Sequence, residues 1–144
     1  SCIVEDAIHW RPREACDGVL IDAPCSATGT LRRHPEIQWI KSPNDVRGVA
    51  KVQRALLKAS VEMVRPGGTI IFTTCSLQPE EGPLLIQEFL GSVTNVRRDP
   101  MDNNASFGIA DAITADGDLR TFSHFLSDQG GMDGFFAARL RKTS

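Results

Sequence analysis

The stretch that decides the fold is Thr69-Ile70-Ile71-Phe72-Thr73-Thr74-Cys75-Ser76. A run of apolar and β-branched residues of this kind predicts a buried strand, and here the strand ends in Cys-Ser. The same arrangement occurs earlier, in Val19-Leu20-Ile21-Asp22-Ala23-Pro24-Cys25-Ser26. Because open α/β sheets bind ligands beyond the carboxyl ends of their strands, we expect both thiols at the ligand-binding edge of one sheet.

The segment between these two strands predicts a helix that connects them. Ser42-Pro43-Asn44-Asp45 is a helix start, with Ser at the N-cap, Pro at the first helical position and an acid three residues after the Ser. Apolar residues then recur at helical spacing from Val46 to Val64, and Arg65-Pro66-Gly67-Gly68 turns the chain into the next strand. Before the helix, we expect a loop over residues 24–40 with a short helix over 35–39.

The remaining elements follow from the same kinds of pattern. They are strands over residues 2–7, 18–23, 93–98, 119–122 and 134–140, a helix over 83–90 closed by Gly91, and loops over 10–17 and 99–118. Strands and helices that alternate predict an α/β fold with right-handed crossovers and a mostly parallel sheet, and the strand-rich tail predicts an antiparallel hairpin at one edge. No glycine-rich strand-to-helix turn is present. Residues 1–144 are therefore expected to form the C-terminal half of a doubly wound domain.

Composition narrows the classes of protein. A hydrophobic content of 41% is typical of a globular chain and argues against disorder. The net charge of −2 gives no overall basic field, so any nucleic-acid binding needs a local patch. The four cysteines contain no C-x-x-C pair, which argues against a zinc knuckle and predicts no metal. Free thiols and the lack of a leader or membrane-length apolar run predict a cytoplasmic protein with no membrane partner. The sequence does not determine an oligomeric state.

Three motifs follow one another along the chain. They are Asp22-Ala23-Pro24-Cys25-Ser26-Ala27-Thr28-Gly29-Thr30 with Arg32-Arg33-His34-Pro35-Glu36-Ile37 after it, Thr73-Thr74-Cys75-Ser76 with Pro79-Glu80-Glu81 after it, and Gly130-Gly131-Met132-Asp133-Gly134-Phe135-Phe136. In this order they resemble the motifs of the Sun-type (also called Fmu) RNA cytosine-C5 methyltransferases, most of all the bacterial enzymes that modify small-subunit rRNA. The resemblance extends from Asp6 to Leu140.

The resemblance implies a Rossmann-like class I methyltransferase that uses S-adenosylmethionine to methylate cytosine C5 in RNA, with 16S rRNA as the expected partner. A thiolate that adds to C6 activates C5 toward the methyl group, which is covalent catalysis. The pair Pro24-Cys25 alone favours Cys25 as the nucleophile, and spacing does not decide the matter. The family resemblance instead implies that Cys75 attacks, that Cys25 assists product release, and that Asp22 stabilises charge on the base.

The same resemblance suggests the binding residues. Asp6, Asp22 and Pro24 are expected to contact the cofactor, and the chain alone is expected to bind it poorly and to be inactive. The cluster Arg32-Arg33-His34 is expected to contact RNA phosphates beside Cys25, although a solvated turn has the same composition. The nucleophilic thiol requires a lowered pKa. Because the segment after Cys75 begins with Glu80-Glu81, that lowering has to come from backbone amides or from RNA-side residues.

Two other functions fit parts of the sequence. One is a non-catalytic RNA-binding module of the same fold, and the other is an unrelated thiol enzyme with a Cys–His pair, for which His34 is the nearby candidate base. Cys2 and Cys16 are expected to be ordinary buried residues. One departure from the family pattern is Gly82-Pro83, where the family continues with Asn. We therefore expect the second helix to start only at Pro83.

Overall fold

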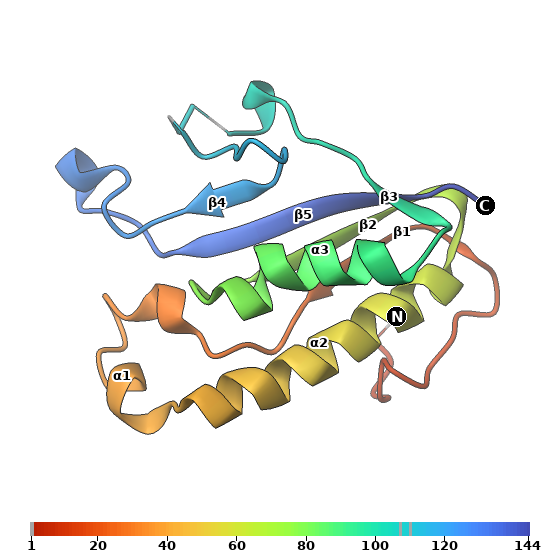
Figure 1. The fold of residues 1–144 in the computed structure, drawn as a ribbon, viewed down its shortest axis with the longest axis horizontal. Coiled ribbons are helices and arrows are strands. Elements are labelled where there is room, and N and C mark those ends of the chain that lie inside the picture. The colour runs from red at the N-terminus through yellow and green to blue at the C-terminus, as the bar shows by residue number, and fades with distance from the viewer. Residues whose placement is uncertain (1, 107, 110) are drawn as a thin grey trace.

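A computed structural model describes residues 2–106, 108–109 and 111–144. The strands are β1 (Cys16–Asp22), β2 (Val64–Thr74), β3 (Val96–Arg98), β4 (Leu119–Thr121) and β5 (Phe135–Lys142), and the helices are α1 (Ile37–Ile40), α2 (Pro43–Met63) and α3 (Pro83–Ser92). Helices α2 and α3 run along one face of the sheet (Figure 1). The predicted α/β class is confirmed.

The strands form a sheet in the order β1-β2-β5-β3, with β4 also paired to β5. Among the described strands only β1 and β2 run parallel, because β5 is antiparallel to β2, β3 and β4. The antiparallel part is thus larger than the edge hairpin expected from the sequence. The last strand lies in the interior of the sheet, where it pairs with neighbours on both sides.

Helix α2 begins where its sequence predicts. The Ser42 Oγ accepts a hydrogen bond from the Asp45 N–H, and the Asp45 carboxylate accepts one from the Ser42 N–H at 2.8 Å. This capping box, with Pro43 at the first helical position, satisfies donors that a helix start leaves unpaired. The inner face of α2 then packs Leu57 and Val61 into the hydrophobic core.

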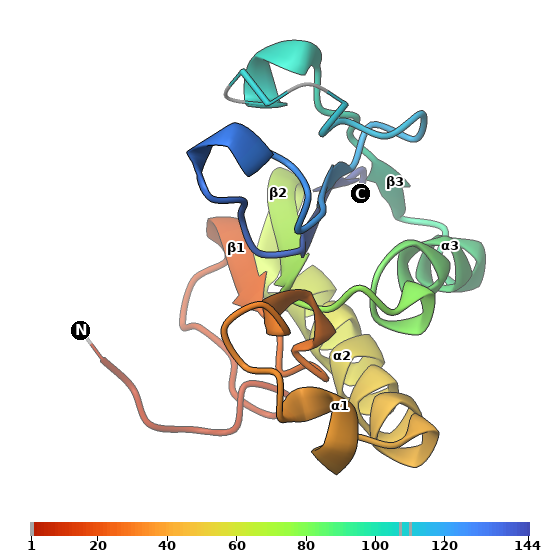
Figure 2. The same ribbon diagram turned by 90° about the vertical axis from the view of Figure 1, so that its left-hand side faces the viewer.

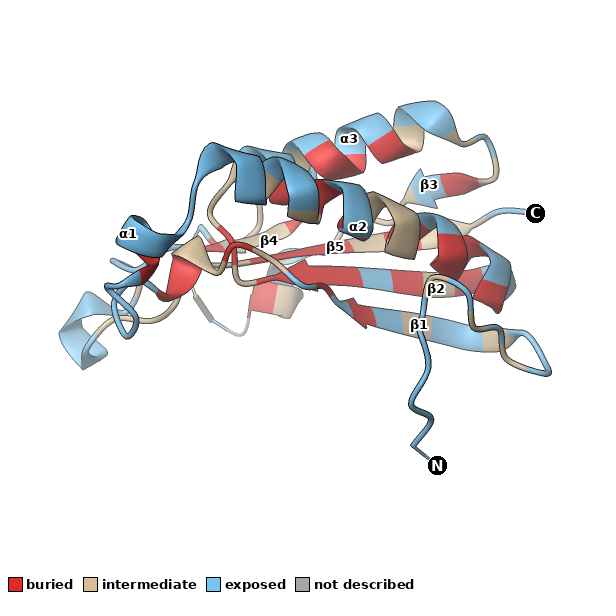
Figure 3. Cartoon of the chain, turned by 90° about the horizontal axis from the view of Figure 1, so that it is seen from below, coloured by how far each residue is buried: buried red, intermediate tan, exposed pale blue. Residues whose placement is uncertain are grey.

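The two faces of the sheet differ in exposure. Residues Ile21, Phe72 and Ala138 are buried in the core, toward the helices. The alternate residues face the other way, and Leu20 is 69% exposed and Ile71 37% exposed. Figure 3 shows the helices on one side of the strands and exposed stretches along β1 and β2. Within the described part of the chain, no helix is both long and apolar enough to cross a bilayer.

The structure corrects several local expectations near the N-terminus. Residues 2–7 form no strand, because a strand needs a neighbour and β1 pairs only with β2 among the described residues. Cys2 is exposed and Cys16 is half-buried, so neither is the buried residue expected. The turn expected at residues 65–68 lies within β2, where the pairing shifts from Cys16–Val64 to Gly18–Thr69.

Other differences lie farther along the chain. Helix α3 starts at Pro83 as expected but passes through Gly91 and ends at Ser92. The strand expected over 93–98 is shortened to Val96–Arg98. The long loop expected over 99–118 contains a single 3-10 turn over Asn103–Ser106, and residues 107 and 110 of that loop lie outside the described residues.

Candidate active site

The two motif cysteines lie in contact. Cys25 and Cys75 follow the carboxyl ends of the parallel strands β1 and β2, and their Sγ atoms are 3.2 Å apart. Both thiols are free and half-buried. Adjacent parallel strands thus place side chains 50 residues apart in the sequence at one point on the sheet edge, where the sequence predicted them.

The environment raises the pKa of the Cys75 thiol to about 12. Burial is the largest cause of the raised pKa, followed by the hydrogen bond to Cys25. The charge of Cys25 and the charge of Asp22 raise the pKa further. The lowered pKa that a nucleophilic thiol requires is therefore not found in the free chain. At neutral pH the Cys75 thiol is protonated, and a change in its surroundings is needed before it can attack.

All three motifs meet at Gly29. Its N–H donates to the Cys75 carbonyl at 2.8 Å, and its own carbonyl accepts from the Gly134 N–H at 2.8 Å. A Cβ at this position would lie 2.1 Å from the Gly134 oxygen and 2.6 Å from the Cys75 oxygen. Figure 2 looks onto this end of the sheet, where the loops after β1, after β2 and before β5 gather. Only a residue without a side chain allows this approach.

Hydroxyl groups join the two cysteine loops just beyond the thiols. The Oγ of Ser26 lies 3.1 Å from the Oγ of Ser76, which is 3.2 Å from the Thr28 Oγ1. The Thr28 Oγ1 also accepts a hydrogen bond from the Leu77 N–H at 2.9 Å. Because Ser26 and Ser76 are fully buried, these contacts fix the Cys25 loop against the Cys75 loop.

The buried carboxylate of Glu81 forms a hydrogen bond to the backbone beside Cys25. The Oε2 of Glu81 accepts hydrogen bonds from the Ser26 N–H at 2.8 Å and from the Gln53 Nε2 at 3.1 Å. Gln53 also donates to the Pro24 carbonyl at 2.7 Å, so the residues on both sides of Cys25 are held. The sequence showed Glu81 only as one of two acids that follow Cys75 and did not indicate its burial. In the structure its side chain is completely buried. The only signal for this role was its place in the second motif.

Arg120 supports the Cys75 loop in a similar way, and the sequence gave no sign of it. Its Nη1 donates to the Ser76 carbonyl at 3.2 Å and its Nη2 to the Leu77 carbonyl at 2.8 Å. The guanidinium also lies over the rings of Phe122 and Phe136, at 5.4 and 5.7 Å. Burial lowers the pKa of Arg120. Arg120 therefore links β4 to the loop that carries Cys75.

The residues expected to bind the cofactor lie on two segments. Asp22 is exposed at the end of β1, and the Thr73 Oγ1 is 3.5 Å from its Oδ1. Asp6 is exposed and accepts a hydrogen bond from the Ile8 N–H at 2.9 Å. A cavity of about 380 Å³ lies between these segments, with Ala7, Trp10 and Asp22 in its wall. Asp22 thus lines a space next to the Asp6 segment, and its charge also acts on the Cys75 thiol.

The predicted RNA-binding cluster is tied to the third motif. The Arg33 Nε donates to the Asp133 Oδ2 at 2.8 Å, and Arg32 lies 3.7 Å from the same carboxylate. The hydrogen bond from Arg33 is the main reason that the pKa of Asp133 is lowered. The His34 Nδ1 is 3.1 Å from Glu36.

Among the described residues no histidine contacts either cysteine, so nothing here favours a Cys–His enzyme. The described residues also contain no cluster of three potential metal ligands.

Comparison with known proteins gives a consistent match. Residues 3–141 match the family described as 16S rRNA methyltransferase RsmB/F. The ribosomal RNA small subunit methyltransferase B of Shewanella oneidensis is 37% identical over 94% of this chain and 29% of its own length.

Solved structures show the same relationship. The crystal structure of PH0851 superposes with a TM-score of 0.82 at 31% identity, over 97% of this chain and 30% of that one. NSun6 from Pyrococcus horikoshii, solved with SFG, gives a TM-score of 0.67 at 25% identity, over 87% of this chain and 29% of that one. The chain therefore spans less than a third of the length of each of these relatives.

Proposed function

The chain belongs to the RsmB/F family of 16S rRNA methyltransferases, as its motifs predicted, and on that premise we propose that the complete protein methylates C5 of a cytosine in RNA. Small-subunit rRNA is the proposed substrate and the cytoplasm the proposed location. The observation that carries the proposal is the pair of thiols, 3.2 Å apart, at the ends of two adjacent parallel strands. Two thiols at one point suit a reaction in which a covalent bond to the base is first made and then broken.

In this mechanism Cys75 is the nucleophile. Its thiolate forms a bond to C6 of the cytosine, which places electron density on C5, and Asp22 stabilises the charge that develops at N3 and N4 of the base. After methyl transfer the C5 proton leaves, and the electron pair of that C–H bond expels the Cys75 thiolate as the C6–S bond breaks. Cys25, in contact with Cys75, assists this elimination as the acid–base group.

Formation of the Cys75 thiolate has to be coupled to substrate binding, because its pKa in the free chain is raised to about 12. Arg33 is a candidate cation for stabilising the thiolate: its pKa is raised mainly by the hydrogen bond to Asp133, and a charge on Cys75 contributes least. In the free chain Arg33 pairs with Asp133. A reorganisation of that pair when RNA binds would increase the influence of Arg33 on the thiol.

S-adenosylmethionine is the proposed methyl donor, and bound there it supplies an electrophilic methyl group. The relative NSun6 was solved with SFG, an analogue of this cofactor. Asp6, Asp22 and Pro24 are the proposed contacts. The 380 Å³ cavity beside Asp22 is of a size that small-molecule sites have, and the exposed carboxylate can accept hydrogen bonds there. We expect this chain by itself to bind the cofactor poorly and to be inactive.

RNA is the proposed partner, and Arg32, Arg33 and His34 are the proposed phosphate contacts. Their side chains are between 45% and 54% exposed, so they can reach a phosphate beside the thiols. The target cytosine has to be unstacked before C6 becomes accessible to a thiol.

The test uses the complete protein and RNA that carries 5-azacytosine, which traps the covalent intermediate. We expect Cys75→Ser to abolish the adduct on this RNA. On unmodified RNA, where the wild type releases the base, we expect Cys25→Ala to make the adduct persist, and the control Cys2→Ser to behave as the wild type on both. Adduct formation that is undiminished in Cys75→Ser would show that the nucleophile is assigned wrongly. Tight RNA binding by the wild type with no methyl transfer would instead favour the non-catalytic module.

A further inference from the structure

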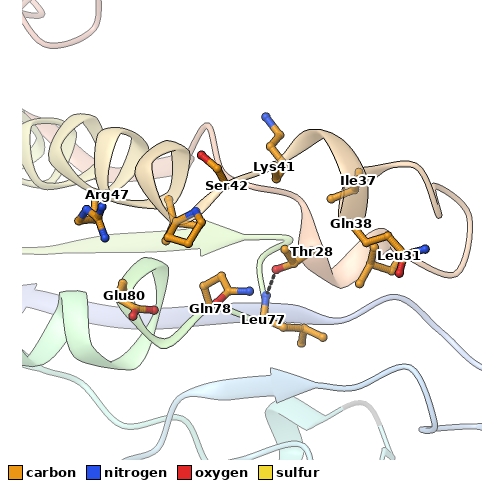
Figure 4. A pocket seen from close by; sticks show the side chains of 12 residues that line it. Thr28, Leu31, Ile37, Gln38, Lys41, Ser42, Arg47, Leu77, Gln78 and Glu80 are labelled. Atoms are coloured by element: carbon orange, nitrogen blue, oxygen red, sulfur yellow. Dashed lines mark hydrogen bonds between the residues drawn. The ribbon is translucent and has the colours of Figure 1, made fainter.

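A pocket of about 530 Å³ opens beside the thiols, and the proposed reaction does not use it. It lies between the turn that joins α1 to α2 and the loop that follows Cys75 (Figure 4). Thr28, Lys41, Arg47, Leu77 and Gln78 are among its lining residues, whereas neither cysteine lines it. We call it the lateral pocket.

The lateral pocket shares a wall with the candidate active site. The hydrogen bond from the Leu77 N–H to the Thr28 Oγ1 crosses between its two sides. Leu77 follows Cys75 by two residues, a chain separation that spans at most about 7 Å. An occupant of the lateral pocket therefore contacts the loop that carries Cys75, two residues beyond the thiol.

The chemistry of the walls fits a nucleotide. Leu31, Ile37 and Val46 give apolar surface for the flat face of a base. Gln38 and Gln78 contribute side-chain amides, each with donors and an acceptor for the edge of a base. A volume of this size lies within the range of small-molecule sites.

The charges at the lateral pocket fit a phosphate. Lys41 and Arg47 supply two positive charges, against the single carboxylate of Glu80. Among the described residues neither cation forms a salt bridge within 4 Å: the Arg47 guanidinium bonds to the neutral side chain of Asn44, and Lys41 interacts with the Asp45 carboxylate only at longer range. Arg32 and Arg33, in contrast, are already paired with Asp133.

Further cations follow along α2 away from the thiols, of which Arg54 is paired with Glu88. Arg47 and Glu80 also line an adjoining cavity of about 260 Å³, which reaches Lys51 and Arg54. Arg47, Lys51 and Arg54 are spaced four and three residues apart, so they share one face of the helix. A strand that leaves the lateral pocket can follow this face.

We propose that the lateral pocket holds a nucleotide adjacent to the target cytosine in single-stranded RNA, with its base on the apolar wall and its phosphate on Lys41 and Arg47. The inference rests on the proposed function, since it names where the flanking part of the same substrate binds. Unstacked RNA is the appropriate ligand, because its bases are free to enter pockets one at a time.

The test compares two double variants of the complete protein on an unmodified 16S rRNA transcript. Lys41→Ala/Arg47→Ala removes the two cations of the lateral pocket, and Lys58→Ala/Arg97→Ala removes two exposed cations that line none of the cavities described above. We expect the first to raise KM for RNA about tenfold with kcat within about twofold, and to lower the slope of log K against log salt by about 1.4. The second is expected to change neither.

A third variant separates shape from charge. Val46→Trp fills the lateral pocket without altering its charge, so KM should rise while the salt slope stays constant, provided that circular dichroism shows a folded protein. Unchanged KM and slope in Lys41→Ala/Arg47→Ala would overturn the proposal, and so would equal effects of both double variants. If the wild type transfers no methyl group, the proposed function fails, and filter binding of the same RNA still decides whether the lateral pocket contributes.

Discussion

Replacement of Gly29 by alanine tests how the three motifs are held together. A Cβ there would lie 2.1 Å from the Gly134 oxygen, 2.6 Å from the Cys75 oxygen and 2.7 Å from the Gly134 carbonyl carbon. All three atoms belong to the backbone, so no side chain can rotate away. The loops have to separate by about 1.3 Å or more to restore an ordinary contact distance.

The expected destabilisation follows from what that separation breaks. The hydrogen bonds from Gly29 N–H to the Cys75 carbonyl and from Gly134 N–H to the Gly29 carbonyl both lengthen. Each contributes about 1 kcal/mol, and overpacking of a tight site adds about 1–3 kcal/mol. We therefore expect Gly29→Ala to lower the free energy of unfolding by about 3–5 kcal/mol.

The assay is urea unfolding of the complete protein, followed by pulse labelling of Cys25 and Cys75. The matched control is Gly48→Ala, because a Cβ on Gly48 meets no atom within 4 Å on the exposed side of α2. That change should stabilise the helix by up to about 1 kcal/mol. If Gly29→Ala shifts the unfolding free energy by less than about 1 kcal/mol, the loops are not held through this contact.

Two further predictions concern the neighbours of the thiols. Cys25→Ala removes the hydrogen bond and the charge that help raise the pKa of Cys75, so that pKa should fall. The thiolate is the reactive form, and a lower pKa increases its fraction at a given pH. Alkylation of Cys75 at pH 8 should therefore become faster, and its pH profile should shift to lower pH. An unchanged or upward-shifted profile would contradict the role of Cys25 in raising the pKa of Cys75. Arg120→Met keeps the apolar stem but removes two hydrogen bonds to the carbonyls of the Cys75 loop. It should cost about 2–4 kcal/mol in urea unfolding, whereas Arg97→Met at an exposed position should stay within about 0.5 kcal/mol, and equal effects of the two changes would refute the role of Arg120.

The features that could be predicted from the sequence are those that a few neighbouring residues determine. The start of α2 depends on Ser42, Pro43 and Asp45, which interact within one turn, and it was predicted correctly. The placement of Cys25 and Cys75 at one edge of the sheet followed from two similar strands, since parallel strands end at the same edge. The direct contact of their sulfur atoms was not predicted.

The features that the sequence did not reveal depend on residues far apart. Arg33 pairs with Asp133 across 100 residues, and no local pattern distinguishes that pair from a solvated turn. Glu81 is buried because the Cys25 loop and Gln53 pack over it, which depends on the complete fold. The strand expected at residues 2–7 failed for the same reason, because strand formation depends on a pairing partner and not on the segment alone.

Strand β5 lies inside the sheet but follows β1 and β2 in the sequence, and this order affects folding during synthesis. A ribosome releases β1, α2 and β2 before β5, and β2 then lacks one of its two neighbours until residues 135–142 have emerged. The Gly29 carbonyl likewise lacks its hydrogen-bond donor until Gly134 has emerged. Between the release of β2 and that of β5, a nascent chain therefore exposes an unpaired strand edge and unsupported thiols, and exposed strand edges of this kind favour aggregation of folding intermediates. Strand β5 thus supplies the second neighbour of β2, and the residue just before it supplies the hydrogen bond to Gly29 beside the two cysteines.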